Sequence, residues 1–354
     1  MNAPTGRRIR VAVVFGGRST EHAISCVTAG SVLQAIDREK YDVIPIGITQ
    51  DGQWVQEADD PSRLRIVDGK LPAVDPTRPA AIREFADVDV VFPLLHGPWG
   101  EDGTIQGLFE MSDVRYVGSG VLASAVSMDK AFMKIALVAS GLPVMPSHVV
   151  TAREWAADPA AVRERVAALG YPLFVKPARG GSSIGIAKAH SSGDLDAAIE
   201  TALAHDPKIL VEVSAEGARE VECGVLGAVD GGVDTSLPAE IRITGDHEFY
   251  DFEAKYLPEE ATELDVPAIL PEGVEDRMRT LAAEAFIAAG CEGLARVDFF
   301  LMPDGSLVIN ELNTMPGFTP LSMFPQMWAA SGLEYGALVD RLLTLALQRP
   351  TGLR

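Results

Sequence analysis

The stretch that most constrains the fold is RVAVVFGG, residues 10–17, an almost continuous apolar run that ends in two glycines. Such a run is typical of a strand buried on both faces of a parallel sheet, because a strand with one exposed face alternates apolar and polar residues. A helical pattern over residues 21–36 follows, with Ser19 or Thr20 as the expected N-cap. A buried parallel strand followed directly by a helix predicts an open α/β domain.

Alternating strands and helices extend this pattern through the first third of the chain. Strands are expected at 41–49, 88–97 and 114–118, and a helix near 104–111. The sequence therefore predicts an N-terminal open parallel α/β domain over residues 1–126.

The rest of the chain has a different pattern, which predicts two α+β units. In the first, over residues 127–215, the SMDK segment begins a helix with Ser127 as its expected cap, and TAREW forms a capping box. Strands are expected in this unit at 171–177, 184–189 and 208–213. From residue 216 to 354, amphipathic strands linked by turns, with a long helix near 273–290, indicate an antiparallel unit.

Composition excludes several classes of protein. The formal net charge of −20 argues against general nucleic-acid binding, which needs a basic surface. No apolar run is long enough to span a membrane, and the one near the N-terminus is too short for a signal peptide. Cys26, Cys223 and Cys291 are too scattered for a disulfide framework or a zinc site. A cytoplasmic protein with no membrane partner is expected.

The segment GLARVDFFLMPDGSLVINELN, residues 293–313, predicts a hairpin around an Asp304-Gly305 turn. If these two residues alone form the turn, counting along the strands places Asp298 opposite Glu311, and Arg296 opposite Asn313. The alternate positions Ala295, Val297, Phe299 and Leu301 then face the core. Asn310 falls on that buried face as well, and counting gives no reason for a polar residue there.

Two carboxylates placed opposite each other call for a cation between them, because like charges on facing residues are destabilising. One interpretation is a structural salt-bridge cluster in which Arg296 supplies the charge. The other is Mg²⁺, which prefers oxygen ligands and is usually completed by substrate phosphates. The Asn313 amide oxygen would be a further ligand of this kind.

Basic residues beside glycines are the candidates for binding an anion. Lys176 precedes the glycine-serine loop 178–185, whose backbone N–H groups can surround a phosphate, although a plain hairpin tip has the same composition. Lys130 is expected in the first turn of a helix, where the helix dipole disfavours a cation, so it is either paired with a bound anion or solvated. Lys255 lies in an acidic stretch and indicates nothing alone.

Other nucleotide and catalytic motifs give little. The P-loop pattern, the zinc-protease motif and the nucleophile elbow are absent. A G-x-G-x-x-A at Gly118, Gly120 and Ala123 lies at the end of the first domain, where a dinucleotide site, and with it an oxidoreductase, is not expected. His96 follows a predicted strand in a glycine-rich loop, a usual place for a ligand, whereas His22 is expected to cap or pack.

Seven segments together resemble the D-alanine–D-alanine ligases of the ATP-grasp superfamily, in the family's order and over nearly the whole chain. They are VFGGRSTEHAIS, LLHGPWGEDGTIQG, SMDK, VKPARGGSSIG, FYDFEAKY, ARVDFF and NELNTMPGFT. The resemblance implies an ATP-grasp fold, in which two α+β subdomains clamp ATP beside the N-terminal domain. It implies that two D-alanine molecules are joined through an acyl phosphate, releasing ADP and phosphate, for peptidoglycan precursor synthesis.

The resemblance also implies site residues, each at the position that matches the family's motif. Two Mg²⁺ (or Mn²⁺) ions are expected on Asp298, Glu311 and Asn313. The ATP-binding positions are Lys130, Lys176, Ser182, Ser183, Glu212, Glu220, Lys255 and Asn310, with Glu222 as the alternative to Glu220. The catalytic positions are Glu21, Ser182, Tyr256, Arg296 and Gly317. The substrate-binding positions are Glu21, His96, Lys255, Arg296, Gly317 and Ser322.

The same resemblance gives expectations for the reaction. Glu21 is expected to bind the ammonium of the first D-alanine, and Arg296 and the Gly317 N–H the oxyanion. Segments 178–185 and 246–260 are expected to cover the site and exclude water. A homodimer is expected. Tyr256 favours dipeptide formation over the alternative, a D-alanine–D-lactate ligase, whereas a non-catalytic nucleotide-binding protein would lack a metal ligand or Arg296.

Overall fold

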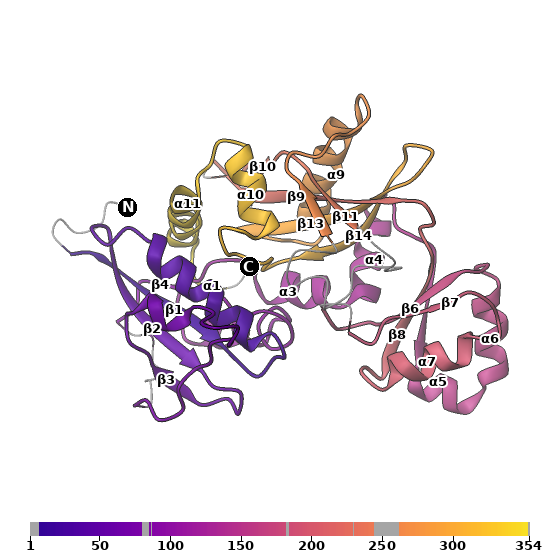
Figure 1. Cartoon of the computed structure of the whole chain (residues 1–354), viewed down its shortest axis with the longest axis horizontal. Helices are drawn as coiled ribbons and strands as arrows, with labels where there is room; N and C mark the ends of the chain where they lie inside the picture. Colours follow the sequence, from indigo (N-terminus) through magenta and orange to yellow (C-terminus); the bar gives the residue numbers. More distant parts are fainter. Residues whose placement is uncertain are drawn as a thin grey trace.

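The computed structural model describes residues 7–79, 85, 87–181, 184–228, 230–243 and 262–352. Within these residues the strands form three separate sheets, one from each third of the chain. Figure 1 shows the N-terminal sheet at the left, the C-terminal sheet at the upper centre and the central sheet at the lower right. The mixture of a parallel α/β unit with antiparallel α+β units confirms the predicted fold class.

The N-terminal sheet has the order β3-β2-β1-β4, with the run of residues 10–17 at its interior. β1 (Ile9–Gly16) pairs in parallel with β2 (Tyr41–Ile48) and β4 (Val90–Pro93), while the short edge strand β3 (Trp54–Gln56) is antiparallel. Helices α1 (His22–Ala35) and α2 (Thr104–Met111) confirm the predicted helices. The expected strand at 114–118 is wrong: it is reduced to one bridge, between Val91 and Tyr116.

The central sheet is antiparallel, with the order β5-β8-β6-β7. Its strands are β5 (Ser147–Thr151), β6 (Leu173–Pro177), β7 (Ala187–Ala189) and β8 (Lys208–Val213). Helices α5 (Ala152–Ala157), α6 (Pro159–Ala167) and α7 (Leu195–Leu203) belong to the same part of the chain. The capping box at the start of α5 is confirmed, since Thr151 and Glu154 bond each other's backbone N–H groups.

The C-terminal sheet is also antiparallel, with the order β12-β11-β9-β13-β14 and with β10 paired to β9. Its strands are β9 (Arg219–Gly227), β10 (Val233–Thr235), β11 (Ala239–Ile243), β12 (Thr262–Asp265), β13 (Leu294–Leu301) and β14 (Leu307–Asn313). The long helix predicted near 273–290 is α9 (Val274–Ala288). Two further helices, α10 (Met323–Ala330) and α11 (Tyr335–Gln348), end the chain.

The SMDK segment joins two helices instead of starting one. α3 (Val121–Met128) ends there and α4 (Lys130–Ala139) begins, and the residue between them, Asp129, accepts hydrogen bonds from the backbone of Ala131 and Phe132. The prediction of Ser127 as the cap is therefore wrong. A carboxylate at the N-cap is the more favourable choice, because it also offsets the positive end of the helix dipole.

Helix α11 packs against α1 and β4 of the N-terminal unit, whereas α10 packs against β9 of the C-terminal sheet (Figure 1). One hydrophobic core contains Val13 and Phe92 of that sheet together with Phe324 of α10 and Leu342 of α11. Arg349, just after α11, reinforces the junction: it donates to the carbonyl of Gly118 and pairs with Glu292 at 2.5 Å. The loop that follows β4 contacts the segment after β14, since both His96 and Glu101 hydrogen-bond to the backbone of Met315.

The fold also accounts for the G-x-G-x-x-A motif. Gly118 and Gly120 precede α3, and a Cβ added at Gly293 would lie only 3.0 Å from the Gly118 nitrogen. These glycines allow two chain segments to approach closely.

In the described ranges, no helix is both long and apolar enough to cross a membrane. The domain boundaries 1–126, 127–215 and 216–354 stay a prediction.

Candidate active site

One large cavity, of about 1920 Å³, lies where the three sheets meet. Its walls come from the loops after β1 and β4, the start of α4, both antiparallel sheets and the segment after β14. It is lined by the described residues of the predicted site: Glu21, His96, Lys130, Lys176, Glu212, Glu220, Arg296, Asp298, Asn310, Glu311, Asn313, Gly317 and Ser322. The fold therefore brings residues that are up to three hundred positions apart into one site.

The β13–β14 hairpin has the predicted pairing at the site but not the predicted turn. Asp298 pairs with Glu311 and Arg296 with Asn313, as counting from a two-residue turn had placed them. The turn, however, has three residues, since Met302 N–H donates to the Ser306 carbonyl at 2.9 Å around Pro303-Asp304-Gly305. A bulge between Asp298 and Phe299 then restores the expected register.

The residue that the bulge inserts is Asn310, because Asp298 pairs with Glu311 whereas Phe299 pairs with Ile309. A bulge turns an extra side chain away from the face that strict alternation would give it. Asn310 consequently lines the cavity, where its amide oxygen accepts from Lys176 Nζ at 3.5 Å. The polar residue that counting placed on the buried face thus faces the ligand cavity instead. The core positions Val297 and Phe299 are buried as predicted.

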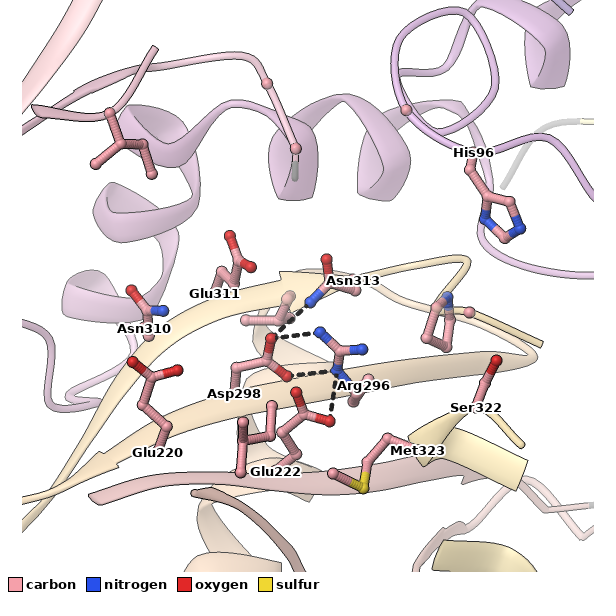
Figure 2. Close-up of a pocket in the computed structure, with 18 of the residues that line it drawn as sticks. His96, Glu220, Glu222, Arg296, Asp298, Asn310, Glu311, Asn313, Ser322 and Met323 are labelled. Atoms are coloured by element: carbon pink, nitrogen blue, oxygen red, sulfur yellow. Dashed lines mark hydrogen bonds and ion pairs between the residues drawn. The ribbon is translucent and has the colours of Figure 1, made fainter. Parts of the chain in front are cut away.

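Arg296 holds two carboxylates in what we term the carboxylate-rich cluster, defined as Arg296, Asp298 and Glu222. Its Nε and Nη2 donate to the two oxygens of Asp298, each at 2.7 Å, and Nε lies 3.1 Å from Glu222 Oε2. Burial would lower the pKa of Arg296, but Asp298 and Glu222 together raise it well above its ordinary value. Figure 2 shows these bonds, and the Asn313 Nδ2 that donates to Asp298 at 2.9 Å.

Lys130 and Glu311 form a second, separate pair. The Lys130 Nζ lies 3.4 Å from Glu311 Oε2 and donates to the Gly180 carbonyl at 2.8 Å. Lys130 is buried, so the interpretation of a solvated lysine is wrong. The cation at the start of α4 is compensated by Glu311 and by the Asp129 cap, and a bound anion is not needed to explain its place in the helix.

Glu212 lies between two lysines in what we term the lysine-rich cluster, defined as Lys134, Glu212 and Lys176. Lys176 Nζ is 2.6 Å from Glu212 Oε1, and Lys134 pairs with Oε2. Burial alone would raise the pKa of Glu212, but Lys176 and Lys134 lower it below its ordinary value. Glu212 is therefore a buried anion between two cations. Glu220, on β9, lines the same cavity.

The loop after β4 places His96, Gly97 and Glu101 beside Glu21. A Cβ at Gly97 would overlap a carboxylate oxygen of Glu21, so only glycine lets the two segments approach this closely. Burial and the charge of Glu21 raise the pKa of Glu101 to about 8. Burial lowers the pKa of His96, although Glu21 opposes that shift, and the ring is neutral near pH 7.

The segment after β14 carries the remaining predicted positions. Ser322 is the N-cap residue of α10, and its hydroxyl accepts from Thr319 N–H at 3.1 Å. A Cβ at Gly317 would lie 3.2 Å from Ser322 Oγ, so the two residues are neighbours. Four predicted residues lie outside the described ranges: Ser182, Ser183, Lys255 and Tyr256.

The structure adds three residues to the site: Glu101 and Lys134, which the sequence did not single out, and Glu222, which was only the alternative to Glu220. Each has an ionisable side chain that is at least partly buried, and each contacts a predicted site residue or the segment that carries one. Local signals existed for two of them. Lys134 follows Lys130 by one helical turn, and Glu222 follows Glu220 on the same face of β9. Glu101 gave no such signal, because its partners come from other segments.

The fold and cavity define a class before any comparison of sequences. Two antiparallel α+β units that enclose a cavity lined by lysines and acidic hairpin residues form the ATP-grasp fold. Family models match residues 10–119, as the "D-ala D-ala ligase N-terminus", and residues 137–344, as the "D-ala D-ala ligase C-terminus". The chain belongs to the D-alanine–D-alanine ligase family.

Individual relatives agree along their whole length. A "D-alanine--D-alanine ligase" of Paenarthrobacter aurescens is 56% identical, with 100% of this chain and 99% of that protein covered. The Streptomyces griseus protein of the same name is also 56% identical, over 98% and 95%. Among solved structures, the VanG D-Ala:D-Ser ligase from Enterococcus faecalis superimposes with a TM-score of 0.82 at 36% identity, covering 96% of this chain and 100% of that one.

Proposed function

We infer that this protein is an ATP-dependent ligase that joins two D-alanine molecules into D-alanyl-D-alanine for peptidoglycan precursor synthesis. A carboxylate is a poor acyl donor, so ATP first phosphorylates the first D-alanine to an acyl phosphate. The amine of the second D-alanine then attacks, and phosphate leaves. ADP, phosphate and the dipeptide are the products. The observation that carries this inference is the convergence of Lys176 and Glu212, the carboxylate-rich cluster, Glu21 and Gly317 in one cavity of a family member.

The lysines of the cavity suit the phosphates of ATP. Lys130 and Lys176 bring two ammonium groups to one wall, and the glycine-bearing loop at Gly180 lies within hydrogen-bond reach of Lys130. We assign the adenosine side to Glu212 and Glu220, and further phosphate contacts to Asn310, Ser182, Ser183 and Lys255. Positive charge arranged before the reaction stabilises the transferring phosphoryl group, because no reorganisation is needed as charge develops.

Asp298, Glu311 and Asn313 are the residues that would hold the two Mg²⁺ (or Mn²⁺) ions. They fit hard cations, since they offer two carboxylates and an amide at one end of the hairpin. Figure 2 shows the Asn313 oxygen pointing away from Asp298, while its nitrogen donates to that carboxylate. When bound, the ions supply charge that neutralises the phosphates. The chain's own part is to keep Asp298 in place through the bidentate bond from Arg296.

The amino acid substrates fit the opposite end of the cavity. Glu21 is the proposed partner of the first D-alanine's ammonium, with His96 close to its carboxylate. Lys255 and Ser322 are the proposed partners of the second carboxylate. The Gly317 N–H and Arg296, whose Nε and Nη2 are used by carboxylates, are the proposed oxyanion donors. Ser182 and Tyr256 are proposed to hydrogen-bond with Glu21 and close the site against water.

The test measures phosphate release from ATP and Mg²⁺ with D-alanine, with L-alanine, or with D-alanine plus D-lactate, while mass spectrometry identifies the product. D-alanine-dependent release with formation of the dipeptide is expected. L-alanine, as the matched control of opposite hand, should give only the background rate. The absence of D-alanine-dependent release at every pH would overturn the proposal, and the depsipeptide as the main product would transfer it to the D-lactate alternative.

We also propose that the protein is cytoplasmic, since both substrates and ATP are cytosolic metabolites. We further propose that it is a homodimer. Exposed apolar side chains at Phe132, Ile135 and Val138, which recur every third residue along α4, suit a subunit contact. Light scattering during gel filtration measures the mass directly. A monomeric mass at micromolar concentration would contradict the dimer without affecting the proposed reaction.

A further inference from the structure

The backbone of Met315 is held at both its N–H and its carbonyl oxygen by a single loop of the N-terminal unit. Glu101 Oε1 accepts the Met315 N–H at 3.2 Å, and His96 Nδ1 lies 3.1 Å from the Met315 carbonyl oxygen. The two residues are five positions apart in the loop after β4, whereas Met315 is more than two hundred positions away. A segment tied to another part of the molecule at both its donor and its acceptor has little freedom to shift.

The bond from His96 fixes the state of its ring. A carbonyl oxygen only accepts, so Nδ1 carries the proton and donates to Met315. In the neutral ring Nε2 is then an acceptor, and the Thr28 hydroxyl lies 3.2 Å from it. Both ring nitrogens are therefore engaged within the protein, and the side chain is buried. In this arrangement His96 acts on the site through Met315.

Glu101 is built into the loop in a comparable way. Its other oxygen, Oε2, accepts the Gly97 N–H at 2.5 Å, so the carboxyl bridges its own loop and Met315. The Gly97 carbonyl in turn accepts from the Glu101 backbone N–H at 2.9 Å, which closes the loop on itself. Gln106 from α2 donates to the Gly100 carbonyl at 2.8 Å and ties this loop to the helix behind it. The bridge thus rests on a rigid base.

Only Pro316 separates Met315 from Gly317. Proline fixes its own φ near −65°, so the orientation of Met315 is passed to the next peptide with few soft rotations left. Asn313 lies two residues before Met315, at the end of β14. A displacement of Met315 therefore moves the Gly317 N–H relative to Asn313 and the other residues of the β13–β14 hairpin.

We propose that Glu101 is a positioning residue for bond formation: with His96 it clamps Met315 and so sets the Gly317 N–H at the oxyanion. The inference rests on the proposed ligase function and concerns its second step. The lysines and the hairpin carboxylates that are proposed to bind ATP for the first step lie outside the clamp, although His96 is also proposed to lie close to the carboxylate of the first D-alanine. Attack by the second amine needs the Gly317 donor in place. Misplacement by about 1 Å can cost on the order of a hundredfold in rate.

The experiment follows the dipeptide and the phosphate formed from the same reaction mixture, using Glu101→Gln, Glu101→Asp, His96→Phe and the double variant Glu101→Gln/His96→Phe. Gln turns an amide NH₂ toward one of the two backbone N–H groups, and Asp is too short to reach both. We expect dipeptide formation to fall roughly ten- to a hundredfold. The KM for ATP should stay near that of the wild type, and phosphate should exceed dipeptide because the acyl phosphate hydrolyses. Glu200→Gln, an exposed acid on α7, is the matched control.

The double variant distinguishes a shared clamp from two independent effects. If both residues act through Met315, the double variant should be little slower than the slower single variant, since one displaced peptide cannot be displaced twice. Multiplying effects, or an unchanged ratio of dipeptide to phosphate in Glu101→Gln, would overturn the inference. If Glu101→Gln does not fold, as judged by thermal unfolding, Glu101→Asp carries the same test. A wild-type protein without D-alanine-dependent phosphate release would instead overturn the proposed function itself.

Discussion

The two charge clusters of the cavity are built from the same kinds of residue but in opposite proportion. In the lysine-rich cluster, two ammonium groups share the carboxylate of Glu212. In the carboxylate-rich cluster, Asp298 and Glu222 share the guanidinium of Arg296. The first cluster comes from α4 and the central sheet, the second from the C-terminal sheet. Among the three residues that define each cluster, cations are the majority in the first and anions in the second.

The difference shows how one cavity accommodates both phosphates and the cations that accompany them. Complete neutralisation would leave each wall without attraction for an ion, whereas an unpaired buried charge would be costly. Cations on one wall and carboxylates on another, each held among partners, offer a ligand an electrostatic site at a tolerable desolvation cost. Substitutions that remove or displace single charges from these walls test this interpretation.

The largest expected effect on stability comes from Glu212→Gln. The change leaves Lys134 and Lys176 as two buried cations without a carboxylate, and breaking a buried pair in this way costs about 3–5 kcal/mol. Urea unfolding measures the loss in the free energy of unfolding. Glu200→Gln, on an exposed face, should change it by less than about 0.5 kcal/mol. Equal stability of both variants would mean that the lysines do not need this carboxylate.

Glu311→Gln should affect turnover more than stability. The variant keeps the shape of the side chain but removes a charge next to Lys130 and opposite Asp298. We expect kcat for phosphate release to fall by about 10²–10³-fold, the usual cost of removing a preorganised electrostatic partner. Circular dichroism and thermal unfolding should show a wild-type fold. Retained activity would refute Glu311 as a proposed metal ligand.

A pH titration tests the acid that lies outside both clusters. Burial and the neighbouring charge of Glu21 raise the pKa of Glu101 from 4.5 to about 8, although Arg296 opposes the shift and His96 is neutral nearby. Below about pH 4.5 the carboxyl is protonated in both the folded and the unfolded protein. As the pH rises toward 8 only the unfolded chain releases this proton, so the folded state loses stability.

The measurement compares the free energies of unfolding in urea of the wild type and Glu101→Gln between pH 5 and 8. Relative to the variant, the free energy of unfolding of the wild type should fall by roughly 1–3 kcal/mol over this range. Each pKa unit corresponds to about 1.4 kcal/mol. Because the side chain is partly exposed, solvent screening makes the change smaller than the full shift would give. A difference that does not change with pH would mean that Glu101 titrates near its ordinary value.

The smallest effect is expected for an ion pair on the surface. Arg163 and Asp196 lie 2.7 Å apart with side chains about half exposed, on α6 and α7. Asp196→Asn should cost less than about 1 kcal/mol, because solvent screens the pair and the charges gain little by meeting. Urea unfolding beside Glu212→Gln gives the contrast directly. A loss as large as that of Glu212→Gln would remove the distinction between buried and exposed pairs.

The hairpin illustrates how far the sequence could predict the site. Alternation placed Val297 and Phe299 in the core and Asp298 with Glu311 on the other face, and all of this is confirmed. The predicted turn of two residues was one residue too short, and the bulge at Asn310 shifted the pairing by one residue in the opposite direction. The two deviations compensate. The bulge allows Asn310 to accept from Lys176, which lies on another sheet, and such a contact cannot be seen in the local sequence.

Charges on helices were harder to interpret from sequence. The position of Lys130 at the start of α4 was predicted, but its burial and its partners Glu311 and Gly180 come from β14 and a distant loop. The cap of α4 was misassigned, because the SMDK segment was taken as one helix start when it is the junction of two helices. Helix periodicity alone does not show where one helix ends and the next begins.

The sequence by itself determined the fold class, the parallel and antiparallel parts, the core positions and the family, because these depend on local periodicity and on motifs in a fixed order. The tertiary structure alone decided which charges share a partner: Lys134 with Glu212, Glu222 with Arg296, and Glu101 with Met315. These contacts join residues that lie far apart in the sequence. Their strength depends on burial and on distances of a few ångströms, which arise only when the three sheets enclose one cavity.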